Sequence, residues 1–300
     1  MNNWRKNCTL HQGDYRETLA LCGGKADLVL TSPPYAEARG YGSGVAWGDA
    51  DYAALGDAVF AALRPGGWAL VNVDANVREW RPGMGTERGL QPLRMALDWC
   101  DRIGFRMPDR LAFGRNGCPG EYLGRFRNDW EPLWWFQKPG AEGWFDKVPL
   151  SDAAVGGAYV GQGSRSAERD GHRVRRHTGE AAEAGIRRRG TLWAYGSVGN
   201  GHTGAPDIEA EGHSARWPYR LATDIIRCFC PPGGLACDPF VGAGTSAAAA
   251  LEHGRRFVGG DLGTRTADEE RGLDAVPWVV VAERVLEVRG RQQRLFGGTP

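Results

Sequence analysis

The stretch Ala26-Asp27-Leu28-Val29-Leu30-Thr31-Ser32-Pro33-Pro34-Tyr35 decides the fold. Its apolar run leaves no room for a helix and is typical of a short buried strand. Pro33 and Pro34 end the strand, because proline lacks a backbone N–H and fixes φ. The strand therefore delivers Ser32, a stiff backbone and the ring of Tyr35 to its carboxyl end, which is where ligands bind in α/β sheets.

Segments typical of strands and helices alternate on both sides of this stretch. Residues 8–14 predict a short strand and a turn, and residues 15–21 a helix. Further along, apolar spacing predicts helices at 51–63, 93–100, 217–229, 245–252 and 278–288, and strands at 68–73, 110–113, 133–136, 235–237 and 256–260. This alternation indicates an α/β fold built on a doubly wound, mostly parallel sheet.

Composition limits the class of protein. The chain has 300 residues, 42% of them hydrophobic and 24% charged, which is ordinary for a globular protein with a substantial core. A net charge of +1 neither requires nor excludes nucleic acid, so local clusters must decide. Seven cysteines without a CxxC pair do not suggest a disulfide framework or a zinc site. We find no signal peptide and no apolar run that could span a membrane, and we expect an intracellular, cytoplasmic protein.

The composition and the hydrophobic periodicity of the sequence change between residues 140 and 212. Periodicity fades there, Gly, Ser, Arg and Glu dominate, and arginines cluster at 173–176 and 187–189. So long a stretch without regular structure is uncommon inside a compact domain. It is therefore either a solvated linker with scattered arginines or an inserted functional region, and composition alone leaves both open.

A second distinctive turn is Asp238-Pro239-Phe240-Val241-Gly242-Ala243-Gly244-Thr245, which joins a predicted strand to a predicted helix. Glycines at such a turn let the backbone approach a ligand closely. Asp261, at the end of the next strand, is placed to accept hydrogen bonds from ribose hydroxyls. The turn also satisfies the dinucleotide fingerprint in its alanine-ended form, so alone it leaves nicotinamide and flavin cofactors open.

Together, the two motifs resemble the amino-methylating DNA methyltransferases, which transfer a methyl group from S-adenosylmethionine to N4 of cytosine or N6 of adenine. The motif order, with the catalytic motif first and the cofactor motif last, is similar to the beta class of that family. The resemblance covers most of the chain and extends to five further segments: Gly13-Asp14, Leu63–Gly67, Asn128–Glu131, Trp135–Lys138 and His213–Pro218. The chain departs from the family pattern at 262–277, an acidic and glycine-containing stretch.

This resemblance implies a Rossmann-like methyltransferase domain whose catalytic half is 1–139 and whose cofactor half is 213–300, with 140–212 as the inserted target recognition region. It implies catalytic roles for Ser32, Pro33, Pro34 and Tyr35. The residues expected to bind S-adenosylmethionine are Asp14, Thr31, Asp238, Pro239, Phe240, Gly242, Gly244, Thr245 and Asp261. The residues expected to contact double-stranded DNA are Arg173, Arg175, Arg176, Arg187, Arg188 and Arg189. No metal is expected, and a separate cognate restriction endonuclease is an expected type of partner for a bacterial or phage enzyme of this kind.

Within the family, Ser before Pro-Pro-Tyr is typical of cytosine-N4 enzymes, whereas Asp or Asn is typical of adenine-N6 enzymes. Ser32 therefore favours cytosine, with adenine as the alternative. Methylation at carbon 5 of cytosine is not expected, because that chemistry uses a Pro-Cys motif and the chain has none. A non-enzymatic alternative is an inactive DNA-binding or cofactor-sensing module, but both motifs are intact.

Overall fold

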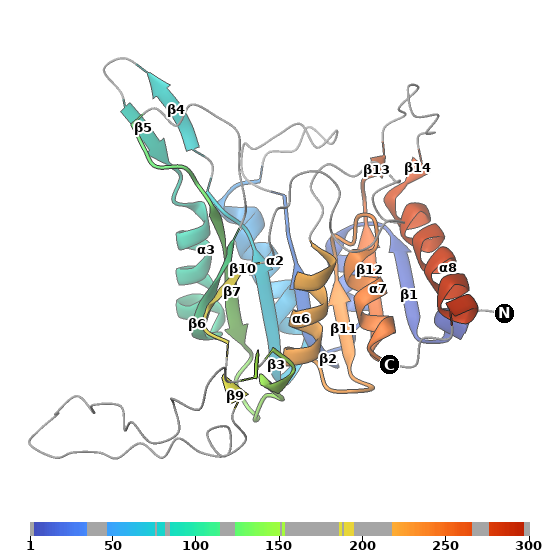
Figure 1. The fold of residues 1–300 in the computed structure, drawn as a ribbon. Helices are drawn as coiled ribbons and strands as arrows, with labels where there is room; N and C mark the ends of the chain where they lie inside the picture. The colour runs from blue at the N-terminus through green and yellow to red at the C-terminus, as the bar shows by residue number, and fades with distance from the viewer. Residues whose placement is uncertain are drawn as a thin grey trace, which may run out of the picture.

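The structure, a computed structural model, describes residues 3–34, 47–75, 77–81, 85–114, 124–150, 152–153, 186–187, 189–194, 218–265 and 276–296. Within these ranges an eight-stranded sheet forms the centre of the molecule (Figure 1). In spatial order its strands are β1 (Cys8–Gln12), β12 (Arg256–Asp261), β11 (Leu235–Asp238), β2 (Ala26–Thr31), β3 (Leu63–Asn72), β7 (Trp130–Gln137), β6 (Arg106–Gly114) and β10 (Leu192–Ala194).

The sheet is mostly parallel, as predicted. The five strands from β1 to β3 all pair in parallel, β7 runs antiparallel to both of its neighbours, and β10 is parallel to β6. The carboxyl ends of β1, β12, β11, β2 and β3 therefore share one edge of the sheet. Since β7 is reversed, its amino end lies at that same edge.

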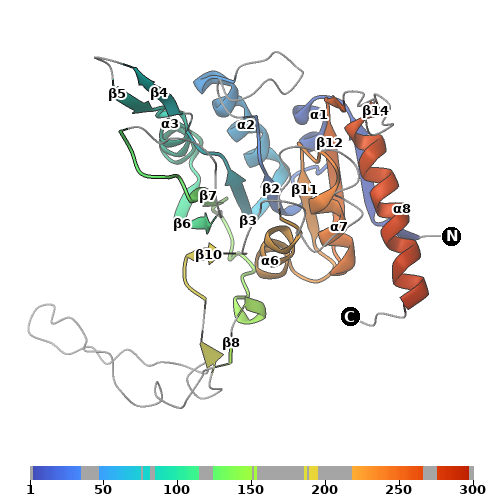
Figure 2. The same ribbon diagram turned by 45° about the horizontal axis from the view of Figure 1, so that its top comes forward.

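Helices cover both faces of the sheet (Figure 2). The first face carries α1 (Tyr15–Ala20), α2 (Asp49–Ala62) and α3 (Gln91–Asp98), which a π-helical turn, η2, extends through Trp99–Ile103. The second face carries α6 (Tyr219–Phe229), α7 (Thr245–Glu252) and α8 (Trp278–Phe296). Val29 of β2 packs into the first layer and Leu28 and Leu30 pack into the second, so alternate side chains of the predicted central strand build two separate cores.

Local sequence accounts for the helix ends. Oδ1 of Asp14 accepts the Arg16 backbone N–H at 2.9 Å and so caps α1. In turn, the Glu17 carboxylate accepts the Asp14 backbone N–H. At the start of α2, Asp51 accepts the N–H of Gly48 at 2.8 Å. At the end of α6, Pro231 and Pro232 cannot continue the helix.

Several short elements complete the described part of the chain. They are the 3-10 turns η1 (Asn3–Lys6) and η3 (Val148–Leu150) and three antiparallel pairs: β4 (Val77–Arg81) with β5 (Gly85–Arg88), β8 (Asp152–Ala153) with β9 (Ile186–Arg187), and β13 (Thr264–Arg265) with β14 (Val276–Pro277). The β4–β5 hairpin extends outward beyond the carboxyl edge of the sheet (Figure 1). In this part of the chain no helix is both long enough and apolar enough to cross a membrane.

The structure differs from the sequence predictions at two strands. The strand predicted at 68–73 begins earlier, at Leu63, because Leu63 already pairs with Ala26 and the Gly66 N–H donates to the Lys138 carbonyl at 2.8 Å. Gly66 takes a positive φ of 79°, so the strand continues through an irregularity instead of starting at Trp68. Residues 192–194, inside the predicted insert, form β10 and extend the main sheet.

Candidate active site

The two sequence motifs lie side by side at the carboxyl edge of the sheet. Strands β2 and β11 are neighbours, with Val29 paired to Cys237, so Thr31 and Asp238 end together. The helices that follow the two strands, α2 and α7, lie on opposite faces of the sheet. This is the topological switch point of an open α/β sheet, where a crevice for ligands forms.

A buried hydrogen-bond cluster joins the two strand ends. The Thr31 hydroxyl donates to Oδ1 of Asp238 at 2.9 Å, and the Ser246 hydroxyl donates to Oδ2 at 2.6 Å. The backbone N–H of Phe240 donates to Oδ1 at 3.1 Å. Thr31, predicted to bind the cofactor, thus directs its hydroxyl at the carboxylate that starts the glycine turn. The cluster fixes the catalytic motif relative to the cofactor motif.

Burial makes the charge of Asp238 costly. Desolvation raises the pKa of Asp238 to about 6, although the hydrogen bonds from Ser246, Phe240 and Thr31 each oppose this rise. The nearby Asp261 raises the pKa a little further. Within the described residues the three donors to this carboxylate are all neutral groups.

Asp261 holds the next part of the turn. Its Oδ2 accepts the Gly242 N–H at 2.9 Å and its Oδ1 accepts the Gly263 N–H at 2.7 Å. Burial raises its pKa, and these two backbone donors lower it. Each carboxylate oxygen can accept a second hydrogen bond, so the predicted contact with ribose hydroxyls is compatible with this geometry.

The two glycines of the turn have different structural requirements. Gly242 and Gly244 both take positive φ, at 48° and 86°. A Cβ on Gly244 would lie 2.9 Å from Cβ of Ala282, so this glycine is needed for contact with α8. Both glycines are predicted to bind the cofactor, and packing against α8 is a further constraint on the backbone at Gly244.

Aromatic side chains form a wall beside the turn. Phe240 lies 5.6 Å from Tyr15 and 5.4 Å from Trp47, and Trp47 lies 5.5 Å from Tyr52, all between ring centroids. The Tyr15 hydroxyl is buried and makes no hydrogen bond of good geometry within the described ranges. Burial raises its pKa, and the Arg16 guanidinium, 4.8 Å from the centre of the ring, lowers it. An orphaned hydroxyl next to Phe240 fits a polar cofactor at this wall. Tyr15 and Trp47 were not predicted as site residues, although Tyr15 directly follows the predicted Asp14.

The predicted catalytic motif is held in place by a residue that the sequence analysis did not identify. The hydroxyl of buried Tyr52 on α2 donates to the Pro34 carbonyl at 2.9 Å. Pro33 is buried, whereas Ser32 and Pro34 are partly exposed, so the motif presents Ser32 at the edge of the sheet. Tyr35 lies outside the described residues.

The remaining predicted cofactor residues lie around the same edge. Pro239 is buried within the turn, and Thr245 is the buried first residue of α7. Asp14 caps α1 just after the end of β1, where the Gly13 N–H donates to the Asp261 carbonyl at 3.3 Å. The structure therefore brings together the end of β2 and all nine predicted cofactor residues.

The structure describes only two of the six predicted DNA-contacting arginines, and neither lies among the predicted cofactor residues. Arg187 lies in β9, and Arg189 forms an ion pair with Asp224 of α6 at 3.1 Å, with both side chains mostly buried. This pair engages the Arg189 guanidinium within the protein. The other four, Arg173, Arg175, Arg176 and Arg188, lie outside the described residues.

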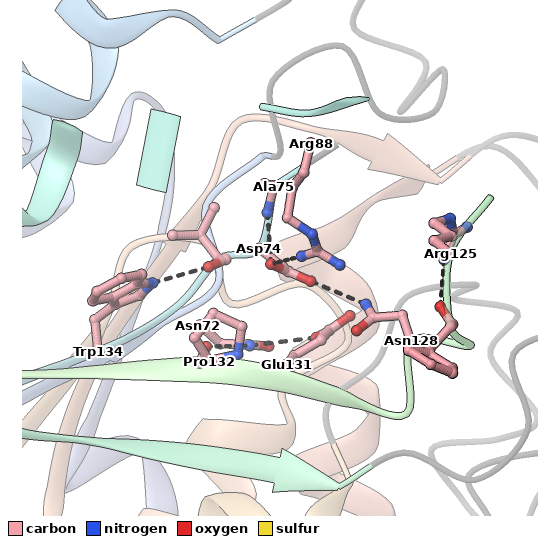
Figure 3. Close-up of polar contacts among 11 residues, drawn as sticks. Asn72, Asp74, Ala75, Arg88, Arg125, Asn128, Glu131, Pro132 and Trp134 are labelled. Carbon is pink, nitrogen blue, oxygen red and sulfur yellow. Dashed lines mark hydrogen bonds and ion pairs between the residues drawn. The ribbon is translucent and has the colours of Figure 1, made fainter. Parts of the chain in front are cut away.

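A second polar cluster, which the sequence analysis did not identify, lies at the end of β3 (Figure 3). The buried Asn72 amide donates to Oε2 of Glu131 at 3.3 Å and to the Pro132 carbonyl at 3.1 Å. Asp74 accepts from Arg88 at 2.7 Å and from Asn128 at 3.1 Å. Because Thr31 pairs with Val71, this cluster is one strand away from Ser32. The sequence offered one signal for this cluster, namely the polar residues Asn72 and Asp74 at the end of the strand predicted at 68–73.

The mostly parallel sheet with helices on both faces and the glycine turn at its switch point belong to the Rossmann-like class, and the family comparison shows that the protein is a methyltransferase. The family model described as DNA methylase, for enzymes acting on N6 or N4 amines, matches residues 26–269, and the chain belongs to this family. Among curated proteins, the orphan methyltransferase M.BamHII of Bacillus amyloliquefaciens is 26% identical over 250 residues, covering 81% of this chain and 86% of that protein.

Solved structures share the fold. The cytosine-N4-specific PvuII DNA methyltransferase matches with a TM-score of 0.61 at 18% identity, covering 94% of this chain and 93% of that one. A putative DNA modification methylase of Thermus thermophilus, TTHA0409, solved with S-adenosyl-L-methionine, matches with a TM-score of 0.55 at 22% identity, covering 93% of each chain. The complex of M1.HpyAVI with the same cofactor gives 0.56 at 16% identity, covering 93% of this chain and 98% of that one.

Proposed function

We propose that this protein transfers a methyl group from S-adenosylmethionine to the exocyclic N4 amine of a cytosine flipped out of a specific double-stranded DNA sequence, in the cytoplasm of a bacterium. The observation that carries the proposal is the junction of Ser32 and the Asp238 turn, which the Thr31–Asp238 hydrogen bond ties together. Membership of the DNA methylase family supplies the substrate class. Two solved structures of the same fold contain the proposed cofactor.

The residues of the turn fit this cofactor. Each carboxylate oxygen of Asp261 can accept a further hydrogen bond from a ribose hydroxyl, and Phe240 offers an aromatic face. The buried Tyr15 hydroxyl makes no hydrogen bond of good geometry in the described part of the chain, so it can bind a polar group of the cofactor. When bound, S-adenosylmethionine supplies an electrophilic methyl group on a sulfonium. The protein groups position that methyl group and exclude water around it.

Ser32 and Pro33 activate the amine. An exocyclic amine is a weak nucleophile because its lone pair is conjugated with the ring. The Ser32 hydroxyl and the Pro33 carbonyl accept its two N–H bonds, which directs the nitrogen lone pair at the methyl group. Tyr52 keeps the backbone of the motif in place through its bond to the Pro34 carbonyl. Positioning of this kind supplies much of the rate of a displacement reaction.

The target base must leave the duplex to reach this edge of the sheet. Flipping costs a few kcal/mol, and stacking on the Tyr35 ring offsets roughly 1–3 kcal/mol of it. Residues 140–212 and their arginines are proposed to read the DNA sequence, with the exception of Arg189, which its ion pair with Asp224 engages inside the protein.

Ser32 is the residue proposed to determine whether cytosine or adenine is methylated. A hydroxyl is a weaker acceptor than the carboxylate of Asp, and it can also donate its own proton to a neighbouring acceptor. The cytosine-N4 specificity of the PvuII enzyme, whose fold is shared, supports the same choice. Adenine N6 is the alternative substrate.

Methyl transfer from labelled S-adenosylmethionine to mixed-sequence genomic DNA, followed by nucleoside mass spectrometry, tests the proposal. We expect N4-methylcytosine. N6-methyladenine would overturn the assignment of the base, and retained cofactor binding without any incorporation would favour a non-catalytic DNA-binding or sensing module.

A further inference from the structure

An exposed segment, Gly124–Asp129, precedes β7 at the catalytic edge of the sheet. Strand β7 is antiparallel to β3, with Leu133 paired to Asn72, so the residues before Trp130 lie beyond the carboxyl end of β3. Val71 of β3 pairs in turn with Thr31, the residue before Ser32. The segment is therefore one strand away from Ser32, where we propose that the target base is held.

Side-chain hydrogen bonds hold this segment in place. The Asn128 amide donates to Oδ2 of Asp74 at 3.1 Å, and Oδ1 of Asp74 accepts the Arg88 guanidinium at 2.7 Å and the Ala75 N–H at 2.8 Å (Figure 3). Asp74 thus connects the segment to the end of β3 and to the end of the β4–β5 hairpin. Since Arg88 compensates the charge of Asp74, this carboxylate repels a polyanion only weakly.

Three consecutive residues of the segment are exposed, although the Arg125 guanidinium also donates to the Phe126 carbonyl at 3.4 Å (Figure 3). The Phe126 side chain is 98% exposed, the largest exposed fraction among the large hydrophobic residues of the described part of the chain. Arg125 and Arg127 on either side of it are exposed as well. Two guanidinium groups that flank an aromatic ring match the chemistry of nucleic acid, because cations bind phosphates and a ring stacks on bases without regard to sequence.

We propose that Arg125, Phe126 and Arg127 form a contact with double-stranded DNA next to the flipped nucleotide. Arg125 and Arg127 bind backbone phosphates, and Phe126 stacks on a base that loses its stacking partner when the target leaves the helix. Asp74 and Asn128 are positioning residues for this contact. The inference rests on the DNA substrate and is independent of which base is methylated.

The stacking contact is tested with Phe126→Ala and Phe126→Trp in methyl transfer to genomic DNA, counting N4-methylcytosine and N6-methyladenine together. We expect Phe126→Ala to lower kcat/KM for DNA by roughly 10-fold and Phe126→Trp to stay within about twofold of wild type. Leu97→Ala, an exposed apolar residue of α3, is the matched control and should have no effect. An unchanged kcat/KM in Phe126→Ala, with cofactor affinity intact in all variants, would overturn the stacking role.

The phosphate contacts are tested through the salt dependence of binding to a mixed-sequence duplex. Arg125→Gln combined with Arg127→Gln should flatten the slope of log K against log[salt] by about 2, since each lost phosphate contact removes about 0.9. Arg106→Gln removes an exposed cation at the other end of β6, paired with Gln137, and should change the slope little. An unchanged slope in the double variant, or an equal change in Arg106→Gln, would overturn the contact. A wrong assignment of the target base would affect neither test. The transfer assay counts both methylated bases together, and the salt series measures binding alone.

Discussion

Two aspartates at the same edge of the sheet, Asp238 and Asp74, are held in opposite ways. Asp238 is buried and accepts only from neutral donors within the described residues, namely two hydroxyls and one backbone N–H. Asp74, whose own side chain is 11% exposed, accepts a charged guanidinium from Arg88, which is 44% exposed, together with an amide and a backbone N–H. The first aspartate joins two central strands, whereas the second connects exposed segments. We conclude that the cofactor side of the site is part of the core of the fold, and that the DNA side is attached to its surface.

Replacement of each aspartate by alanine separates the two sides, and we expect the largest effect at Asp238. Asp238→Ala leaves the Thr31 and Ser246 hydroxyls and the Phe240 N–H buried without an acceptor, at a cost of about 1–3 kcal/mol for each group. It should lower the free energy of unfolding by about 4 kcal/mol and abolish cofactor binding.

Asp74→Ala should cost about 2 kcal/mol, because it leaves the Asn128 amide and the Ala75 N–H without this acceptor. It should leave cofactor affinity unchanged and weaken transfer to DNA. Urea unfolding and calorimetric titration of S-adenosylmethionine measure these effects. Equal destabilisation by the two variants would contradict the distinction between core and surface.

The buried carboxylate also predicts a pH dependence. Because the folded-state pKa of Asp238 is about 6, above its ordinary value, the folded protein binds more protons than the unfolded chain between about pH 4 and 6. The wild type should therefore lose about 2 kcal/mol of stability, relative to Asp238→Asn, as the pH rises from 4.5 to 7.5. Urea unfolding of both proteins from pH 4.5 to 7.5 measures the difference, and a difference that stays constant with pH would contradict the assignment.

The contact between the glycine turn and α8 predicts a loss of unfolding free energy that is smaller than the loss in Asp238→Ala. Gly244→Ala places a methyl group 2.9 Å from Cβ of Ala282, at a φ of 86° that alanine rarely adopts. We expect a loss of about 2–3 kcal/mol in unfolding free energy. The double variant with Ala282→Gly removes the contact with Cβ of Ala282 but keeps the backbone strain and a contact of 3.1 Å with Cα of residue 282, so less than half of the loss should return. Full recovery in the double variant would show that φ contributes nothing.

The sequence predicted the fold well where a physical signal is local. Proline ends β2 and glycines mark the turn after β11, so these elements were located to within a few residues. Contacts between distant segments left no such signal. Tyr52 reaches Pro34 and Gly244 faces Ala282 only because the fold brings α2 and α8 to this edge.

The β4–β5 hairpin and the Asp74 cluster were also missed. Asp74 lies among Arg88 and Asn128, which are 14 and 54 residues away along the chain, so no local pattern connects them. The same limit applies to Arg189, whose sequence places it in a basic cluster and whose partner Asp224 lies 35 residues away.

The central claim is that Ser32, at the end of β2, accepts a hydrogen bond from the amine that is methylated. It is tested most directly by single-turnover methyl transfer with Ser32→Ala, alongside titration of the cofactor. We predict a loss of roughly 100-fold in the rate of transfer, with cofactor affinity changed by less than about twofold because the Thr31–Asp238 junction is intact. An unchanged rate of transfer would contradict the claim.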